Sequence, residues 1–210
     1  MCAVNSMKRS RDSTPIIERK RKMIRTPVKE ETTHEFLMNA IQVKVVRGTT
    51  LKNFFYQHSD AEIEAYGLEV TNAIRSRDIE ILKGLHEEGQ IFQCSNRFGE
   101  SVMHMACRQG SVEVVKFLID QAGVSIQVKD DYGKTPLHDA FWNASPNFDL
   151  VDLLVTRCPS LLFVSDVRGH APLQYARMEH QASWKSFFEE RRQLIVQGLD
   201  DIKEATSASS

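Results

Sequence analysis

The sequence predicts an all-α solenoid of stacked helix-turn-helix units joined by short β-turn or hairpin loops, behind a disordered N-terminal tail. Gly99, Gly133 and Gly169 recur 34 and 36 residues apart, and an alanine stands seven residues after each of them. A second helical pattern follows each copy, as SVEVVKFLI, NFDLVDLLV and SWKSFFEE. Repetition at such a period is typical of solenoids, in which each unit buries its apolar face against its neighbours.

Composition restricts the class of protein. The chain has 210 residues, 41% of them hydrophobic, with a formal net charge of -1, which is enough for one substantial folded domain. No run approaches the roughly 18 apolar residues of a membrane span, and the start, MCAVNSMKRSRD, lacks the apolar stretch of a signal peptide. We therefore expect an intracellular protein of the nucleus, the cytoplasm or both, with no membrane partner.

The cysteines are scattered at Cys2, Cys94, Cys107 and Cys158 without a C-x-x-C pair. This spacing favours free thiols over a disulfide framework or a zinc cluster. We expect neither a metal site nor a cofactor.

Charge and composition divide the chain. Residues 1–35 contain nine Lys or Arg and five Asp or Glu, with few aromatics, so we expect a disordered basic tail. Residues 36–63 form a lead-in or capping segment in which Leu51, Phe54 and Phe55 have helical spacing, and we expect this segment to pack on the first repeat. The repeats then fill 64–192, and 193–210 is a helical extension whose ending, DDIKEATSASS, should fray.

The repeats themselves read RFGESVMHMACRQG, DYGKTPLHDAFWNA and VRGHAPLQYARMEH. Glycine in each turn permits a positive φ, Thr135 stands at an N-cap position and Pro136 at the first helical position. In the second helix Val114, Val115 and Leu118 form a core stripe, continued by Ile119.

An earlier, degenerate copy, EVTNAIRSRDIEILKGLHEEG, matches the two-helix half of the repeat. Ile81, Leu82 and Leu85 take the places of Val114, Val115 and Leu118 in that copy. The match predicts one more helix pair ahead of the three glycine-marked copies.

These residues resemble the ankyrin repeat family, because GKTPLHDA fits its T-P-L-H-x-A signature over about four repeats from Glu64 to Arg192. The copies SVMH and APLQ depart from the signature, and NASPNF lengthens one inter-helix turn. The resemblance implies a non-enzymatic scaffold that binds another protein, of unknown identity, through its turn tips and the concave face of its first helices.

Two interpretations of His138 are a catalytic base and a structural hydrogen-bonding group. His104 occupies the same repeat position, whereas Gln174 in the third copy can hydrogen-bond but cannot act as a base at neutral pH, which favours the structural reading. An alternative is an enzyme that pairs His104 with Cys107, three residues apart, and it would show a reactive Cys107 thiol in the native protein. No catalytic motif appears, so we expect no catalytic residues.

The resemblance assigns partner contacts to turn tips and to the exposed side of each first helix. The predicted partner-binding residues are Arg97, Phe98, Glu100, Arg108, Gln109, Asp131, Tyr132, Lys134, Trp142, Asn143, Arg168, His170, Met178 and Glu179. Exposed large aromatics are either partner anchors or caps on the core, and the sequence leaves both open.

Two basic clusters in the tail, Lys8 and Arg9, then Lys20, Arg21 and Lys22, resemble a bipartite nuclear localisation signal read by an import receptor. Thr14 and Thr26, each before a proline, are candidate phosphorylation sites beside the second cluster. The alternatives are a solvated tail without a signal, and a nuclear regulator or transcription cofactor that touches DNA through the tail. The mildly acidic body makes nucleic-acid binding outside the tail unexpected.

Overall fold

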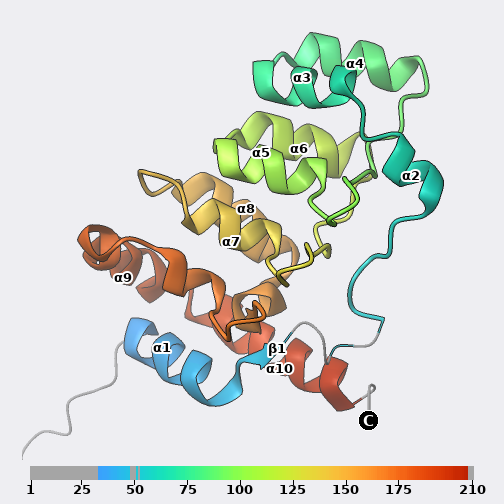
Figure 1. Cartoon of the computed structure of the whole chain (residues 1–210). Coiled ribbons are helices and arrows are strands. Elements are labelled where there is room, and N and C mark those ends of the chain that lie inside the picture. Colours follow the sequence, from blue (N-terminus) through green and yellow to red (C-terminus); the bar gives the residue numbers. More distant parts are fainter. Residues whose placement is uncertain (1–32, 48–50, 52, 208–210) are drawn as a thin grey trace, which may run out of the picture. The chain divides into compact units, whose positions relative to one another are not determined.

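The computed structural model describes residues 33–47, 51 and 53–207, and these fall within one compact unit, Glu31–Ser210. Four units of the stack follow one another along the chain (Figure 1). Their elements are α3 (Leu68–Ser76) and α4 (Ile79–Glu87), α5 (Val102–Gln109) and α6 (Val112–Asp120), α7 (Pro136–Phe141) and α8 (Phe148–Arg157), then the 3-10 turns η3 (Pro172–Tyr175) and η4 (Met178–His180) with α9 (Gln181–Glu189). The first helices α3, α5 and α7 pack side by side, and so do the second helices α4, α6 and α8. The predicted ankyrin solenoid is confirmed.

Helices α5 and α6 begin at residues that the sequence signals, and α5 also ends at one. Ser101 caps α5, since its hydroxyl accepts from the His104 N–H, and Gly110 ends the helix at φ 70°. Ser111 then caps α6, in which Val114 and Leu118 are completely buried. In the first pair Leu82 is buried as predicted, whereas Ile81 is 49% exposed. Helix α4 belongs to the first helix pair of the described stack and packs mainly against α3 and α6.

Positive-φ glycines form the turns between units, as predicted. Gly99 has φ 76° and Gly133 has φ 74°. A Cβ on Gly99 would lie 2.9 Å from the Lys129 carbonyl oxygen of the next turn, so a side chain would also collide there. Neighbouring turns are joined by the Asp131 N–H to the Phe98 carbonyl (3.0 Å) and the Val167 N–H to the Tyr132 carbonyl (2.8 Å).

The first part of the lead-in segment, up to residue 47, does not pack on the first repeat, contrary to the expectation. Helix α1 (Thr33–Lys44) packs against α9, α10 and the 3-10 helix η2 (Pro159–Phe163), at the other end of the stack. Leu37 is completely buried and Ile41 is 2% exposed. The strand β1 (Val46–Arg47) then pairs in parallel with β2 (Val164–Ser165). The apolar face of α1 therefore covers the last helices, whose core would otherwise be open.

From there the chain runs back along the loops to the first repeat. Residues 53–59 are not helical, contrary to the expected helix around Leu51, Phe54 and Phe55. Instead Phe55 is 5% exposed, the Tyr56 N–H donates to the Gln127 carbonyl (2.8 Å), and a short helix α2 (Asp60–Glu64) follows. We call residues 53–66 the strap, because they lie along the loops of successive repeats.

At the other end, helix α10 (Arg192–Ser207) includes most of the ending that was expected to fray. Ile202 is 1% exposed, and α10 packs on η2 so closely that a Cβ on Gly198 would lie 2.5 Å from the Pro159 carbonyl oxygen. This contact with η2 explains why the polar sequence stays helical. Of the tail predicted to be disordered, residues 1–35, the first 32 lie outside the described residues. Residues 33–35 form the start of helix α1, so the predicted boundary was wrong there.

None of the helices in the described residues is long and apolar enough to cross a membrane.

Candidate partner-binding surface

The predicted surface residues fall into columns, because equivalent positions recur in successive repeats. Phe98, Tyr132 and Arg168 each precede a turn glycine, and the first two side chains are 53% and 68% exposed. A second column, at the end of each first helix, consists of Arg108, Trp142 and Met178. Trp142 is 60% and Met178 87% exposed, so both columns present large side chains to solvent.

The other predicted positions complete the pattern. Arg97, Asp131, His170 and Glu179 are exposed, while Glu100, Gln109, Lys134 and Asn143 are half-buried. Sequence reasoning missed Val167, which shares the repeat position of Arg97 and Asp131 and is 47% exposed. The repeat register itself could have identified this residue.

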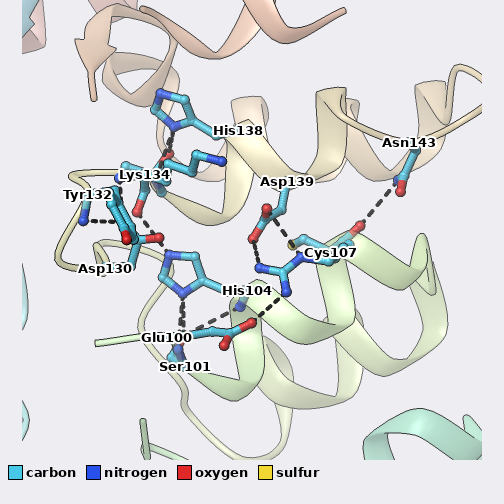
Figure 2. A network of polar contacts seen from close by, with 12 residues as sticks. Glu100, Ser101, His104, Cys107, Asp130, Tyr132, Lys134, His138, Asp139 and Asn143 are labelled. Carbon is cyan, nitrogen blue, oxygen red and sulfur yellow. Dashed lines mark hydrogen bonds and ion pairs between the residues drawn. The ribbon is translucent and has the colours of Figure 1, made fainter. Parts of the chain in front are cut away.

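Behind the surface, two buried histidines join the repeats. His104 Nδ1 accepts from the Ser101 N–H (3.2 Å), which leaves the proton on Nε2, and Nε2–H donates to the Lys134 carbonyl (3.0 Å; Figure 2). His138 repeats this arrangement with Thr135 and the His170 carbonyl. Burial lowers the pKa of His138 to about 4, so the ring stays neutral and structural at neutral pH.

An ion-pair network connects the first helices of two repeats. Asp139 on α7 is buried, and Arg108 on α5 reaches both of its carboxylate oxygens, at 3.0 and 3.4 Å. Arg108 also donates to Glu100 (2.6 Å). Burial alone would lower the pKa of Arg108, but the two carboxylates outweigh it and raise that pKa. The side chain is thus held across the repeat boundary.

Asparagines of the lengthened turn cap the preceding repeat. Asn143 donates to the Cys107 carbonyl (3.2 Å) and Asn147 to the Gly110 carbonyl (2.8 Å), so two carbonyls at the end of α5 gain partners. The insertion NASPNF therefore has a fixed role: it ties the third repeat to the second.

A cluster of cations and aromatic rings lies where the third and fourth repeats meet. Lys134 Nζ is 4.9 Å from the ring centre of Tyr175 and 5.7 Å from that of Trp142, and the two rings are 5.8 Å apart. The Tyr175 hydroxyl donates to Asp166 (2.5 Å) and accepts from Arg168 (2.6 Å). Tyr175 was not among the predicted residues, because its position is Asp139 and Met105 in the other copies and shows no aromatic pattern.

The alternative enzyme site is contradicted by the environment of Cys107. Its side chain is completely buried, and burial raises the pKa of the thiol well above its usual value. His104 is committed to Ser101 and Lys134. A protonated, enclosed thiol cannot act as a nucleophile. Cys94 and Cys158 are also free, and the described residues contain no group of three or more His, Cys, Asp or Glu side chains that could hold a metal.

The strap encloses a groove on the loop side of the repeats. This groove has a volume of about 320 Å³ and lies between Tyr56 and His58 of the strap and the turns at Arg97 and Lys129. The Gln93 side chain lies 3.2 Å from His58 and accepts from the Ser125 N–H (2.7 Å). The strap thus occupies this side of the loops.

Comparison with known proteins agrees with this architecture. A family model of ankyrin repeats matches three copies over residues 70–161. The human SMC5-SMC6 complex localization factor protein 1 is 36% identical over 85 residues, which are 40% of this chain but 8% of that protein. A Rickettsia bellii protein that carries the name ankyrin repeat protein is 30% identical over 105 residues, 50% of this chain and 56% of its own length.

An enzyme is also similar, but only over a short stretch. The L-asparaginase of Dirofilaria immitis is 37% identical over 68 residues, which cover 32% of this chain and 11% of the enzyme. A match that covers so little of a relative does not carry the activity of that whole protein over to this chain. On the repeated signature, the stacked helix pairs and the family match together, residues 70–161 of this chain belong to the ankyrin repeat family.

Proposed function

We propose that this protein is a non-catalytic interaction module that binds a partner protein through its turn tips and the exposed side of its first helices. Ankyrin repeats are protein-binding modules. What we propose beyond this is that the partner binds the face formed by the turn tips and the first helices. The observation that carries it is the pair of columns, in which Phe98, Tyr132, Trp142 and Met178 are each more than half exposed.

Exposure of this kind favours anchors over core caps. A residue that caps the core would be largely covered by its neighbours. Phe141, which directly precedes Trp142, is covered in this way and is only 2% exposed. Large aromatics in solvent are typical of interaction sites, where burial by a partner provides most of the binding energy. The strap lies beside the turn-tip residues Arg97 and Asp131, which line its groove. It leaves the side chains of Phe98 and Tyr132 more than half exposed.

We further propose that the basic tail directs the protein to the nucleus through Lys8, Arg9, Lys20, Arg21 and Lys22. The human relative's name describes that protein as a localization factor. An ankyrin scaffold that recruits a partner protein to a particular location in the cell would have a similar role. A regulator that touches DNA through the tail is the competing reading. Its binding would fall steeply with salt and vanish when residues 1–35 are deleted.

Affinity capture from cell extract tests the proposed face. The wild type is compared with a Tyr132→Ala, Trp142→Ala double variant and with Lys116→Ala, an exposed lysine on α6. We expect a partner that the wild type and the Lys116 variant retain and that the double variant loses. Equal retention by all three proteins would reject this face.

A further inference from the structure

The cluster of Tyr132, Lys134, Trp142, Arg168 and Tyr175, which we call the cation–aromatic patch, indicates the chemistry of the partner. Its members come from two adjacent turn tips, the end of α7 and η3, and are therefore fixed to the boundary between the third and fourth repeats. Contacts within the chain are therefore sufficient to form the patch.

The Tyr175 ring is held rigidly. Its hydroxyl donates to Asp166, and Arg168 donates to that hydroxyl and to the same carboxylate (3.3 Å). Burial would raise the pKa of Asp166, but these hydrogen bonds and those from backbone N–H groups of the turn lower it, so the carboxylate stays ionised. Burial and the bond to Asp166 raise the pKa of Tyr175 to about 12, which keeps the phenol protonated.

A cation of the same chain already lies over both rings. Lys134 Nζ lies within 6 Å of both ring centres, the range of a cation–π interaction, and Arg168 lies 5.9 Å from the Tyr175 ring. A cationic side chain of a partner would be repelled by these two positive charges. The patch is thus unsuited to a basic peptide.

The charges of the patch are unequally matched. Arg168 is paired with Asp166, whose other oxygen accepts from the turn backbone. By contrast, no carboxylate among the described residues forms an ion pair with Lys134. Asp130 of the same turn accepts from the backbone N–H groups of Tyr132 and Lys134. One positive charge therefore remains beside exposed aromatic surface.

We propose that the patch binds an acidic peptide segment of the partner, with a carboxylate on Lys134 and a neighbouring apolar side chain against Trp142. Met178 holds the same repeat position as Trp142 in the next repeat and is 87% exposed, which extends the apolar surface. A preformed site of this kind loses little side-chain freedom on binding. This inference rests on the proposed binding face and adds the class of ligand.

Selection from a random twelve-residue peptide library displayed on phage tests the inference without a known partner. The wild type and Trp142→Ala are panned in parallel. We expect sequences enriched only by the wild type, with an Asp or Glu next to an aromatic or aliphatic residue. Enrichment of basic or uncharged peptides would overturn the acidic ligand but leave the binding face standing, whereas no difference between the two proteins would reject both.

Direct titration then isolates the charge. The most enriched peptide, synthesised with a fluorescent label, is titrated by polarisation against wild type, Lys134→Met, Lys134→Arg and the control Lys116→Met. We expect the affinity to fall about tenfold for Lys134→Met and to change less than about twofold for the other two variants. Unchanged affinity of Lys134→Met would overturn the role of this lysine.

Discussion

His138 Nε2 donates to the backbone carbonyl of His170, 32 residues later in the chain and 3.1 Å away. Its Nδ1 accepts from the Thr135 N–H at 2.9 Å, so one ring closes its own turn and binds the next. His104 forms the same two bonds one repeat earlier, whereas Gln174 in the last copy accepts from the Ala171 N–H of its own turn (2.7 Å). These imidazoles are part of the scaffold.

Substitution of His138 should therefore lower stability. We expect His138→Ala to cost about 1 to 2 kcal/mol, because the buried Thr135 N–H loses its acceptor. His138→Gln should cost less, since Gln174 shows that an amide can accept the bond within the turn. Urea denaturation measures both values. A His138→Ala variant as stable as the wild type would contradict the structural role of this histidine.

The stability should also depend on pH through this ring. The folded pKa of His138 is about 4, below its ordinary value of 6.5, so the unfolded chain binds the proton more readily. The stability that the neutral His138 ring contributes is fully present above pH 6.5, its ordinary pKa, and is lost as the pH falls toward 4. Between about pH 7.5 and about pH 5 the wild type should lose roughly 2 kcal/mol more than His138→Gln. Parallel losses in the two proteins would contradict the low pKa.

Helix α1 should be as important to stability as a repeat helix. Leu37 is completely buried where α1 meets the last helices. Leu37→Ala should cost about 2 to 4 kcal/mol, although this residue lies outside the family match, because it leaves a cavity in the shared core. Chemical denaturation measures the free energy of unfolding of this variant and of Leu137→Ala, which truncates a buried residue of a repeat and serves as the comparison. A loss below about 0.5 kcal/mol would mean that α1 is not part of the folded core.

Local signals explain why so much of the stack could be predicted. The turn glycines, Thr135, Pro136 and the Val114 stripe act within one repeat, and each determines the structure of its own neighbourhood. The position of α1 depends on a contact with α9 and α10, more than a hundred residues away, that no periodicity records. Four of the five patch residues were predicted, because residues such as Trp142 follow the repeat register. Tyr175 was not, because it joins the patch through a tertiary contact.

Nuclear import remains a prediction about residues that the structure does not describe. In a fusion too bulky for free diffusion, Lys20, Arg21 and Lys22 changed together to alanine should abolish nuclear enrichment, because the larger basic cluster is lost. Fluorescence microscopy compares the variant with the unaltered fusion. A Lys83→Ala fusion, altered at a lysine on α4, serves as the control for lost charge. Unchanged enrichment of the triple variant would reject the signal.

Paired measurement of binding and stability for Trp142→Ala tests the central claim most directly. If Trp142 is an anchor, the variant should bind the captured partner more weakly by about 2 kcal/mol or more, with the melting temperature nearly unchanged, since the side chain is 60% exposed. Lys116→Ala should change binding by less than about 0.5 kcal/mol. Full binding by Trp142→Ala, together with a loss of stability as large as that of Leu137→Ala, would contradict the account and make Trp142 a cap on the core.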